Sequence, residues 1–294
     1  MLVLCSCNNA SNNSSQSKAN EVKQQYLPPQ APSMLSSQNE RNTYIAKNFW
    51  SKFDFQDTTQ IQSKVLEQAF VDFLYAIANV PTFECAEQSI RTFMEGSSVD
   101  SVMLEGAITI SEKYLYDPNS PMRNEDLYIC VLEYIVNSPK VDELNKIRPE
   151  YQLEMALKNR VGTIATDFII TTDKKEQIKL SEIKAEHILL LFNNPDCPDC
   201  LRVKETIESK NELFSNVKIV SVYTDSDLTI WKNTNYPKKW LNGYDKNCII
   251  TKQKLYDLKA IPTLYLLNHE LKVILKDAPI DIVLRYLNNH NNNI

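Results

Sequence analysis

Two cysteines separated by two residues, Cys197 and Cys200, constrain the fold of this chain more than any other feature. They follow the largely apolar run 187–192, which is typical of a buried strand, and precede 201–209, where apolar residues recur at helical spacing. Both cysteines therefore lie at a helix start, where unpaired backbone N–H groups and the helix dipole stabilise a thiolate. This arrangement predicts Cys197 as a nucleophile, with Cys200 about one turn on and within disulfide reach.

A second signal follows downstream, in Lys259-Ala260-Ile261-Pro262-Thr263, directly before the strand-like run 264–267. A proline that opens a strand after a turn of small residues is a candidate cis-proline, because only proline makes that isomer low in energy. The alternative is an ordinary turn proline. A Cys-x-x-Cys motif alone is ambiguous between a redox pair and half of a zinc site, and this second signal favours the redox pair.

Together these segments resemble the thioredoxin-like fold. Residues 159–168 resemble the "G-x-x-A-P-x-F" opening of its extracytoplasmic, TlpA/ResA-like branch. Residues 180–183, Leu-Ser-Glu-Ile, resemble the short "L-S-D-L" segment that precedes the first core strand of that branch. The resemblance covers roughly residues 155–290 and implies an α/β domain with a central mixed sheet flanked by helices.

The resemblance also implies a mechanism. Cys197 would attack a substrate disulfide and Cys200 would resolve the mixed disulfide, with Ile261, Pro262 and Thr263 presenting backbone to an extended substrate. The redox-active disulfide Cys197–Cys200 would replace any organic cofactor. Electrons would pass between protein thiol or disulfide substrates and an electron-donor protein.

Residues around the first cysteine are expected to tune the pair. Pro198 suits a first helical position and stiffens the loop. Asp196 and Asp199 place negative charge beside Cys197, which disfavours the thiolate and points to a reductase or isomerase rather than a strong oxidase. Asp199 is alternatively only a carboxylate that interacts favourably with the helix dipole.

Two positions depart from the best-known cytosolic thioredoxins. Leu191 stands where those proteins carry a buried acid, and Asp196 stands where they carry a tryptophan. The sequence therefore shows no obvious residue to accept a proton from the cysteine pair during the reaction. These departures keep a rival hypothesis open, namely a redox-inert thioredoxin-fold lipoprotein that acts as a binding or adaptor protein.

The N-terminus resembles a bacterial lipobox in Leu4-Cys5-Ser6-Cys7. Too few residues precede it for a complete signal peptide, which we interpret as a late start codon or a trimmed N-terminus. Residues 8–42 are rich in Asn, Ser, Gln and Lys, and predict a disordered tether. We expect a lipid anchor at Cys7 that attaches the protein to a membrane of the bacterial cell envelope, facing the periplasm or in the outer membrane; Asn8 favours the latter. The alternative is a chance pair of cysteines.

Residues 43–150 predict an all-helical domain. Apolar residues repeat at helical spacing over 65–77, and further helices are expected over 85–94, 101–116 and 125–136. The segments 49–55 and 114–121 resemble the helical domain of unknown function (DUF5106) that precedes thioredoxin-like domains in Bacteroidetes lipoproteins. The expected organisation is thus a tether over 1–42, a helical domain over 43–150 and a thioredoxin-like domain over 151–294. Cys85 and Cys130 are interpreted as buried thiols, with a disulfide between them as the alternative.

Composition excludes several other functions. A net charge of -5 without a Lys/Arg block disfavours nucleic-acid binding, and only 4 glycines argue against phosphate-binding loops. No metal site is expected, because Cys248 and the three histidines form no second ligand pair along the chain. The aromatic segment between Asp225 and Cys248 is interpreted as the packing of an added helix, with a substrate-facing surface as the alternative.

Overall fold

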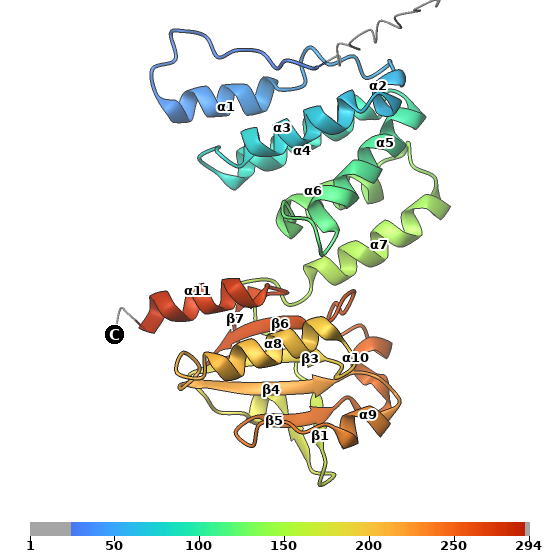
Figure 1. Cartoon of the computed structure of the whole chain (residues 1–294). Helices are drawn as coiled ribbons and strands as arrows, with labels where there is room; N and C mark the ends of the chain where they lie inside the picture. Colours follow the sequence, from blue (N-terminus) through green and yellow to red (C-terminus); the bar gives the residue numbers. More distant parts are fainter. Residues whose placement is uncertain (1–24, 292–294) are drawn as a thin grey trace, which may run out of the picture.

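The computed structural model describes residues 25–291 and consists of a helical region followed by a mixed α/β region (Figure 1). Cys7, the predicted lipidation site, lies outside the described residues. The tether expected up to residue 42 ends earlier, because the Tyr26 ring packs 5.2 Å from Phe53 and stacks on Trp50 at 6.0 Å. Of the helices in this part of the chain, none has the length and apolar character needed to span a bilayer.

Polar caps define the starts of five helices in the first region. The side chains that accept the first free backbone N–H groups are Ser37, Thr82, Asp100, Asn124 and Asp142. The elements are α1 (Gln38–Asn48), α2 (Thr59–Gln62), α3 (Val65–Ile77), α4 (Phe83–Ser97), α5 (Ser101–Ser111), the π-helical turn η1 (Glu112–Tyr116), α6 (Glu125–Asn137) and α7 (Glu143–Leu157). The capped helices are α1, α4, α5, α6 and α7.

Aromatic rings fill the centre of this region. Trp50 is 4% exposed, with ring centroids 4.7 Å from Phe93 and 5.3 Å from Phe73. Helices α3 to α6 lie close to the predicted ranges, because the apolar spacing marks their buried faces, whereas α1, α2 and α7 were not predicted. Helix α7 crosses the boundary expected at residue 150, since its last turn buries Met155 and Ala156.

The second region is built on a seven-stranded mixed sheet in the order β2-β1-β5-β4-β3-β6-β7. The central strands β3, β4 and β5 run parallel to one another. On the β3 side the sheet continues with β6 and β7, and on the β5 side with β1 and β2, and all of these added strands pair in an antiparallel manner. The strands are β1 (Ile169–Thr172), β2 (Gln177–Lys179), β3 (His187–Asn193), β4 (Val217–Tyr223), β5 (Leu241–Tyr244), β6 (Thr263–Asn268) and β7 (Val273–Lys276).

Both faces of the sheet are covered (Figure 1). One face packs against α8 (Pro198–Ser209) and α11 (Ile280–Asn291) through Val203, Ile207 and Leu287. The other packs beneath α10 (Ile249–Lys252), which η3 (Lys246–Cys248) directly precedes, and the loop bearing Tyr256; η2 (Leu180–Glu182) adds Leu180 to this core. Every residue of β3 is therefore buried, which explains its continuous apolar sequence.

A short helix, α9 (Leu228–Asn233), accounts for the aromatic segment that follows β4. Trp231 is 3% exposed and packs edge-on to Tyr244 at 5.0 Å. The interpretation of this segment as helix packing is thus confirmed for Trp231. Cys248, which follows this segment, is half-buried with a left-handed backbone.

A buried ion pair joins the two regions. Lys276 of β7 lies 2.8 Å from the carboxylate of Glu125 at the start of α6, and its side chain is only 6% exposed. The same ammonium donates to the carbonyl oxygens of Ala156 and Lys158, each at 2.7 Å. Burial raises the pKa of Glu125 and lowers that of Lys276, although each charge opposes the shift of the other.

A second group of charges surrounds the loop that leads into β6. Lys259 lies 4.2 Å over the ring of Tyr116 from the helical region and 3.3 Å from Asp257. Arg123 of the helical region binds Asp277 at 3.0 Å. The helical region thus contacts the segment that carries the predicted cis-proline.

Candidate functional site

Cys197 caps the N-terminus of α8. Its backbone is extended, and its Sγ accepts the N–H of Cys200 at 3.4 Å. The residue is partly exposed at the end of β3, whose last residue, Asn193, is fixed by a 2.8 Å hydrogen bond to the Ser221 hydroxyl. The Cys197 sulfur is thus held at the helix N-terminus and remains accessible from solvent.

Cys200 is the buried partner. It is 4% exposed, and burial is the main cause that raises the pKa of its thiol to about 12. Neighbouring negative charge at Cys197 and Asp199 acts in the same direction. The pair thus combines one accessible sulfur with one sulfur that keeps its proton, which is the asymmetry that a nucleophile and a resolving thiol require.

The Ile261–Pro262 peptide bond is cis, as the sequence predicted. Its loop lies directly against the first cysteine, because the Cys197 thiol donates to the Ile261 carbonyl oxygen at 3.6 Å. The Thr263 hydroxyl donates to the Ala260 carbonyl oxygen and is buried. The structure therefore brings the two sequence signals, 64 residues apart, into contact.

The charges beside Cys197 are exposed. Asp199 forms a 3.0 Å ion pair with Arg202 in which both side chains are more than half exposed. Asp196 is exposed, and its backbone N–H bonds the Asn194 side chain at 2.9 Å. Arg202 was not anticipated from the sequence; its spacing of three residues from Asp199 on a helix is the signal that identifies it.

The position beneath the pair is apolar. Leu191 is 1% exposed and packs with Val203 and Ile207 under α8. A different polar group lies near Cys200: the hydroxyl of Tyr236 is buried, finds no hydrogen-bond partner among the described residues, and interacts electrostatically with Cys200. Burial raises the pKa of this phenol. The sequence placed Tyr236 among packing aromatics, and nothing in its spacing revealed this location.

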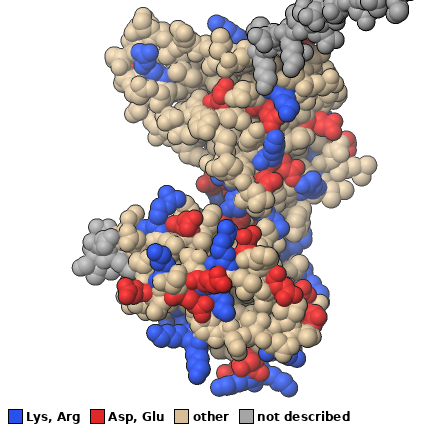
Figure 2. Space-filling model, in the orientation of Figure 1, with Lys and Arg blue, Asp and Glu red and all other residues tan. Residues whose placement is uncertain are grey.

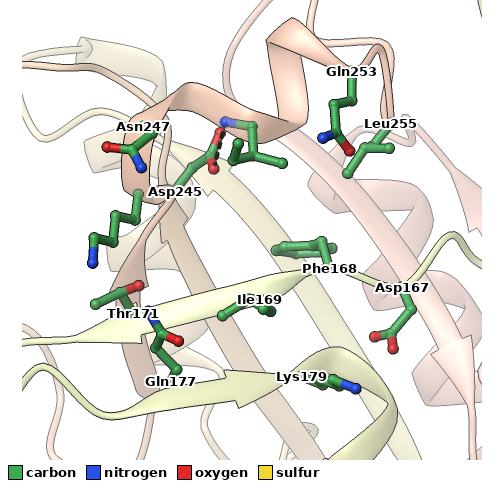
Figure 3. A pocket seen from close by; sticks show the side chains of 12 residues that line it. Asp167, Phe168, Ile169, Thr171, Gln177, Lys179, Asp245, Asn247, Gln253 and Leu255 are labelled. Atoms are coloured by element: carbon green, nitrogen blue, oxygen red, sulfur yellow. Dashed lines mark hydrogen bonds between the residues drawn. The ribbon is translucent and has the colours of Figure 1, made fainter.

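A separate pocket of about 510 Å³ lies between the β1–β2 hairpin and the η3–α10 segment (Figure 3). Its walls combine apolar side chains such as Phe168 and Ile169 with Gln177 and Asn247. Asp245 at its edge accepts the N–H groups of Ile249 and Ile250, each at 2.9 Å, so its carboxylate is already bonded. Neither the cysteine pair nor the cis-proline lines this pocket.

Charges of both signs are mixed on the visible surface. Figure 2 shows Lys and Arg interspersed with Asp and Glu over the sheet region, without a continuous patch of one sign. This distribution offers no single-sign surface on that face for a highly charged ligand.

Residues 4–159 match the family described as a domain of unknown function, DUF5106. A thioredoxin-like protein from Bacteroides caccae ATCC 43185 is 38% identical, with 91% of this chain and 99% of that chain covered and a TM-score of 0.86. The fold class predicted from the sequence, a helical region followed by a thioredoxin-like domain, is therefore confirmed.

Shorter structures match the C-terminal part. The C-terminal domain of an uncharacterized protein from Bacteroides fragilis NCTC 9343 is 40% identical over 44% of this chain and 98% of its own, with a TM-score of 0.43. The thioredoxin domain of a thiol-disulfide oxidoreductase from Bacteroides vulgatus is 18% identical over 45% of this chain and 97% of its own, with a TM-score of 0.39. Comparison with curated proteins gives no significant match.

Proposed function

Because the chain belongs to the DUF5106 family and carries a C-terminal thioredoxin-like domain, we propose that it is a thiol–disulfide oxidoreductase that acts on protein disulfides. The observation that carries this proposal is the contact between the partly exposed Cys197 sulfur and the cis-proline loop, with buried Cys200 one helical turn away. An extended substrate lying along Ile261 would present its disulfide directly to Cys197.

The reaction balances without a further cofactor. The Cys197 thiolate attacks one substrate sulfur, the substrate S–S bond breaks, and a substrate thiolate leaves. Cys200 then gives its proton to the departed substrate thiolate and attacks the Cys197 sulfur, which releases the second substrate sulfur as a thiolate that solvent protonates and forms the Cys197–Cys200 disulfide. The substrate has gained two electrons, and an electron-donor protein with a dithiol restores the reduced pair.

The charges near the pair support a reductase or isomerase rather than a strong oxidase. A carboxylate beside a redox dithiol destabilises the ionised, reduced form relative to the disulfide, and Asp196 and Asp199 supply such charge here. Arg202 partly neutralises Asp199, which moderates this effect. A pair that is readily oxidised donates its electrons to substrates.

The rival proposal is a redox-inert adaptor with the same fold. Leu191 supports it, because no carboxylate takes the proton of Cys200 from that position. The close packing of both cysteines and the cis-proline loop favours the oxidoreductase, since an adaptor has no need of this contact.

We further propose that the protein is anchored to the bacterial cell envelope through a lipid on Cys7. The support is the Leu4-Cys5-Ser6-Cys7 motif. Expression from the native bacterial locus with its upstream sequence retained, with and without Cys7→Ser, followed by metabolic labelling with a radioactive fatty acid, tests it. We expect label and membrane association only with Cys7 present, and unlabelled wild-type protein would refute the anchor.

The reduction potential of the Cys197–Cys200 pair tests the main proposal. Equilibration in thiol buffers should give a two-electron transition near that of thioredoxin, about -270 mV, for a reductase, or about -180 mV for an isomerase. A value near -120 mV would identify an oxidase instead. Absence of a reversible transition, or a transition that survives Cys197→Ser, would leave the adaptor.

A further inference from the structure

All three histidines of this chain, His187, His269 and His290, gather at one edge of the sheet. His187 is the first residue of β3 and pairs in register with Asn268, the neighbour of His269 in the chain. His290 comes from the last turn of α11 and reaches the same place. Sequence spacing gave no sign of this group, because the three residues come from three separate elements.

Two of these imidazoles and one carboxylate form a compact set. Glu186, His187 and His290 each present a possible metal-ligand atom, and these atoms all lie within 4.8 Å of one another. The two imidazole rings are 5.1 Å apart and nearly perpendicular, at 81°. The His290 Nε2 atom lies 4.0 Å from the Glu186 Oε1 atom.

The surrounding packing holds the set in place while leaving it accessible. His187 is 7% exposed, and Tyr286 packs against it edge-on at 6.2 Å and stacks on His290 at 5.9 Å. Glu186 is exposed and His290 is half-buried, so an ion can enter from solvent. Glu186 also lines a cavity of about 780 Å³, which gives its carboxylate room to turn.

From this geometry we propose that Glu186, His187 and His290 bind a divalent transition-metal ion, with Zn²⁺ as the ion that fits best. Imidazole nitrogens and a carboxylate oxygen are common zinc ligands, whereas Mg²⁺ and Ca²⁺ select oxygen. Tetrahedral binding at about 2.0–2.2 Å requires the ligand atoms to approach to roughly 3.4 Å. Small rotations of the exposed Glu186 and the half-buried His290 side chains would bring the atoms to this distance.

The fourth position has two available ligands. A water molecule can fill it, as in zinc sites with three protein ligands. His269 can also fill it, because it is exposed, adjoins the register partner of His187 and lies within electrostatic reach of that ring. Either way the ion joins the first core strand to the last turn of the C-terminal helix.

The site is independent of the cysteine pair. It lies at the beginning of β3, whereas Cys197 follows the end of that strand, so seven strand residues put roughly 20 Å between them. The proposal therefore does not rest on the proposed oxidoreductase activity. An ion here would stabilise the native protein by mass action, since the unfolded chain does not hold the three ligands together.

Zinc titration of the full-length protein tests the proposal. The variant in which Cys5, Cys7, Cys197 and Cys200 are all replaced by serine serves as the parent, because a reduced dithiol would itself bind zinc. Calorimetry with Zn²⁺ should show one equivalent bound, and the melting temperature should rise with zinc. Adding His290→Ala or Glu186→Gln should weaken binding by about 10–100-fold or more, whereas Asp281→Asn, in the first turn of the same helix, should leave it unchanged.

Co²⁺ provides a second readout that depends on ligand type. Visible bands without the near-ultraviolet band of a cobalt thiolate would support imidazole and carboxylate ligands. Circular dichroism of His290→Ala shows whether this exposed substitution leaves the fold intact. The proposal is overturned if the parent binds no zinc, if folded His290→Ala binds it as tightly as the parent, or if a thiolate band appears.

Discussion

The Cys197 sulfur lies 3.6 Å from the carbonyl oxygen of Ile261, the residue that precedes the cis-proline. The contact joins the end of β3 to the start of β6, two strands that pair side by side in the sheet. It leaves Cys197 partly exposed while Cys200, three residues later, is buried. The two thiols of the pair should therefore differ in their reactivity.

Alkylation should distinguish the two cysteines. In reduced native protein we expect iodoacetamide to modify Cys197 at least about tenfold faster than Cys200, because the latter is buried and keeps its proton. Mass spectrometry of peptides taken at successive times measures each site separately. Buried Cys85 and Cys130 serve as internal controls. Equal rates at Cys197 and Cys200 would contradict the asymmetry described above.

Stability should depend on pH through Cys200. Burial raises the pKa of its thiol from the ordinary 9.0 to about 12, so the folded protein binds this proton more tightly than the unfolded chain. The resulting stability is complete below pH 9 and is lost as pH rises from 9 towards 12. Urea unfolding of reduced wild type should therefore show a steeper decline from pH 8.5 to about 10.5 than reduced Cys200→Ser. Parallel declines would show that the buried Cys200 thiol contributes no pH-dependent stability.

The buried ion pair between the two regions should matter more than an exposed pair. Lys276→Met leaves Glu125 and the carbonyl oxygens of Ala156 and Lys158 without their donor. We expect the free energy of unfolding to fall by about 3–5 kcal/mol.

The exposed pair of Lys113 with Glu67 provides the control, because Lys113 is 58% exposed. Lys113→Met should change stability by no more than about 1 kcal/mol. Denaturant unfolding of both variants measures the two free energies. Similar losses of stability would mean that the buried pair contributes no more than the exposed one.

Two tyrosines should respond oppositely to loss of their hydroxyl groups. Tyr236 has no hydrogen-bond partner in the described part of the chain, so Tyr236→Phe should raise the free energy of unfolding by about 1 kcal/mol. The Tyr223 hydroxyl donates to the Asp227 carbonyl oxygen at 2.7 Å, so Tyr223→Phe should lower it by a similar amount, about 1 kcal/mol. Chemical denaturation measures both, and a destabilised Tyr236→Phe would reveal a partner for that hydroxyl.

Local sequence was sufficient to predict much of this structure. Apolar spacing marked helices α3 to α6 of the first region, though not α1, α2 or α7, and the burial of β3 on both faces produced its apolar run 188–192. The position of the cysteines at a helix start followed from the strand, turn and helix around them. Each of these features depends on residues that are neighbours in the chain.

Features that depend on distant segments could not be predicted in the same way. Tyr26 lies in a stretch whose polar composition indicates a tether, yet it packs against Trp50 of the helical region. The pairing of Lys276 with Glu125 and the convergence of His187 with His290 join residues more than 100 positions apart, without periodicity or motif to reveal them. Only the tertiary fold brings such residues together.

The depth at which Cys200 lies has a practical use. A chain with Cys200→Ser keeps the accessible Cys197 but lacks the group that would release a bound protein, so a captured client would remain covalently attached. Cys85 and Cys130 are buried and would not compete for clients. The native fold thus makes this variant a selective bait, and the proteins recovered on it by reduction would name the clients directly.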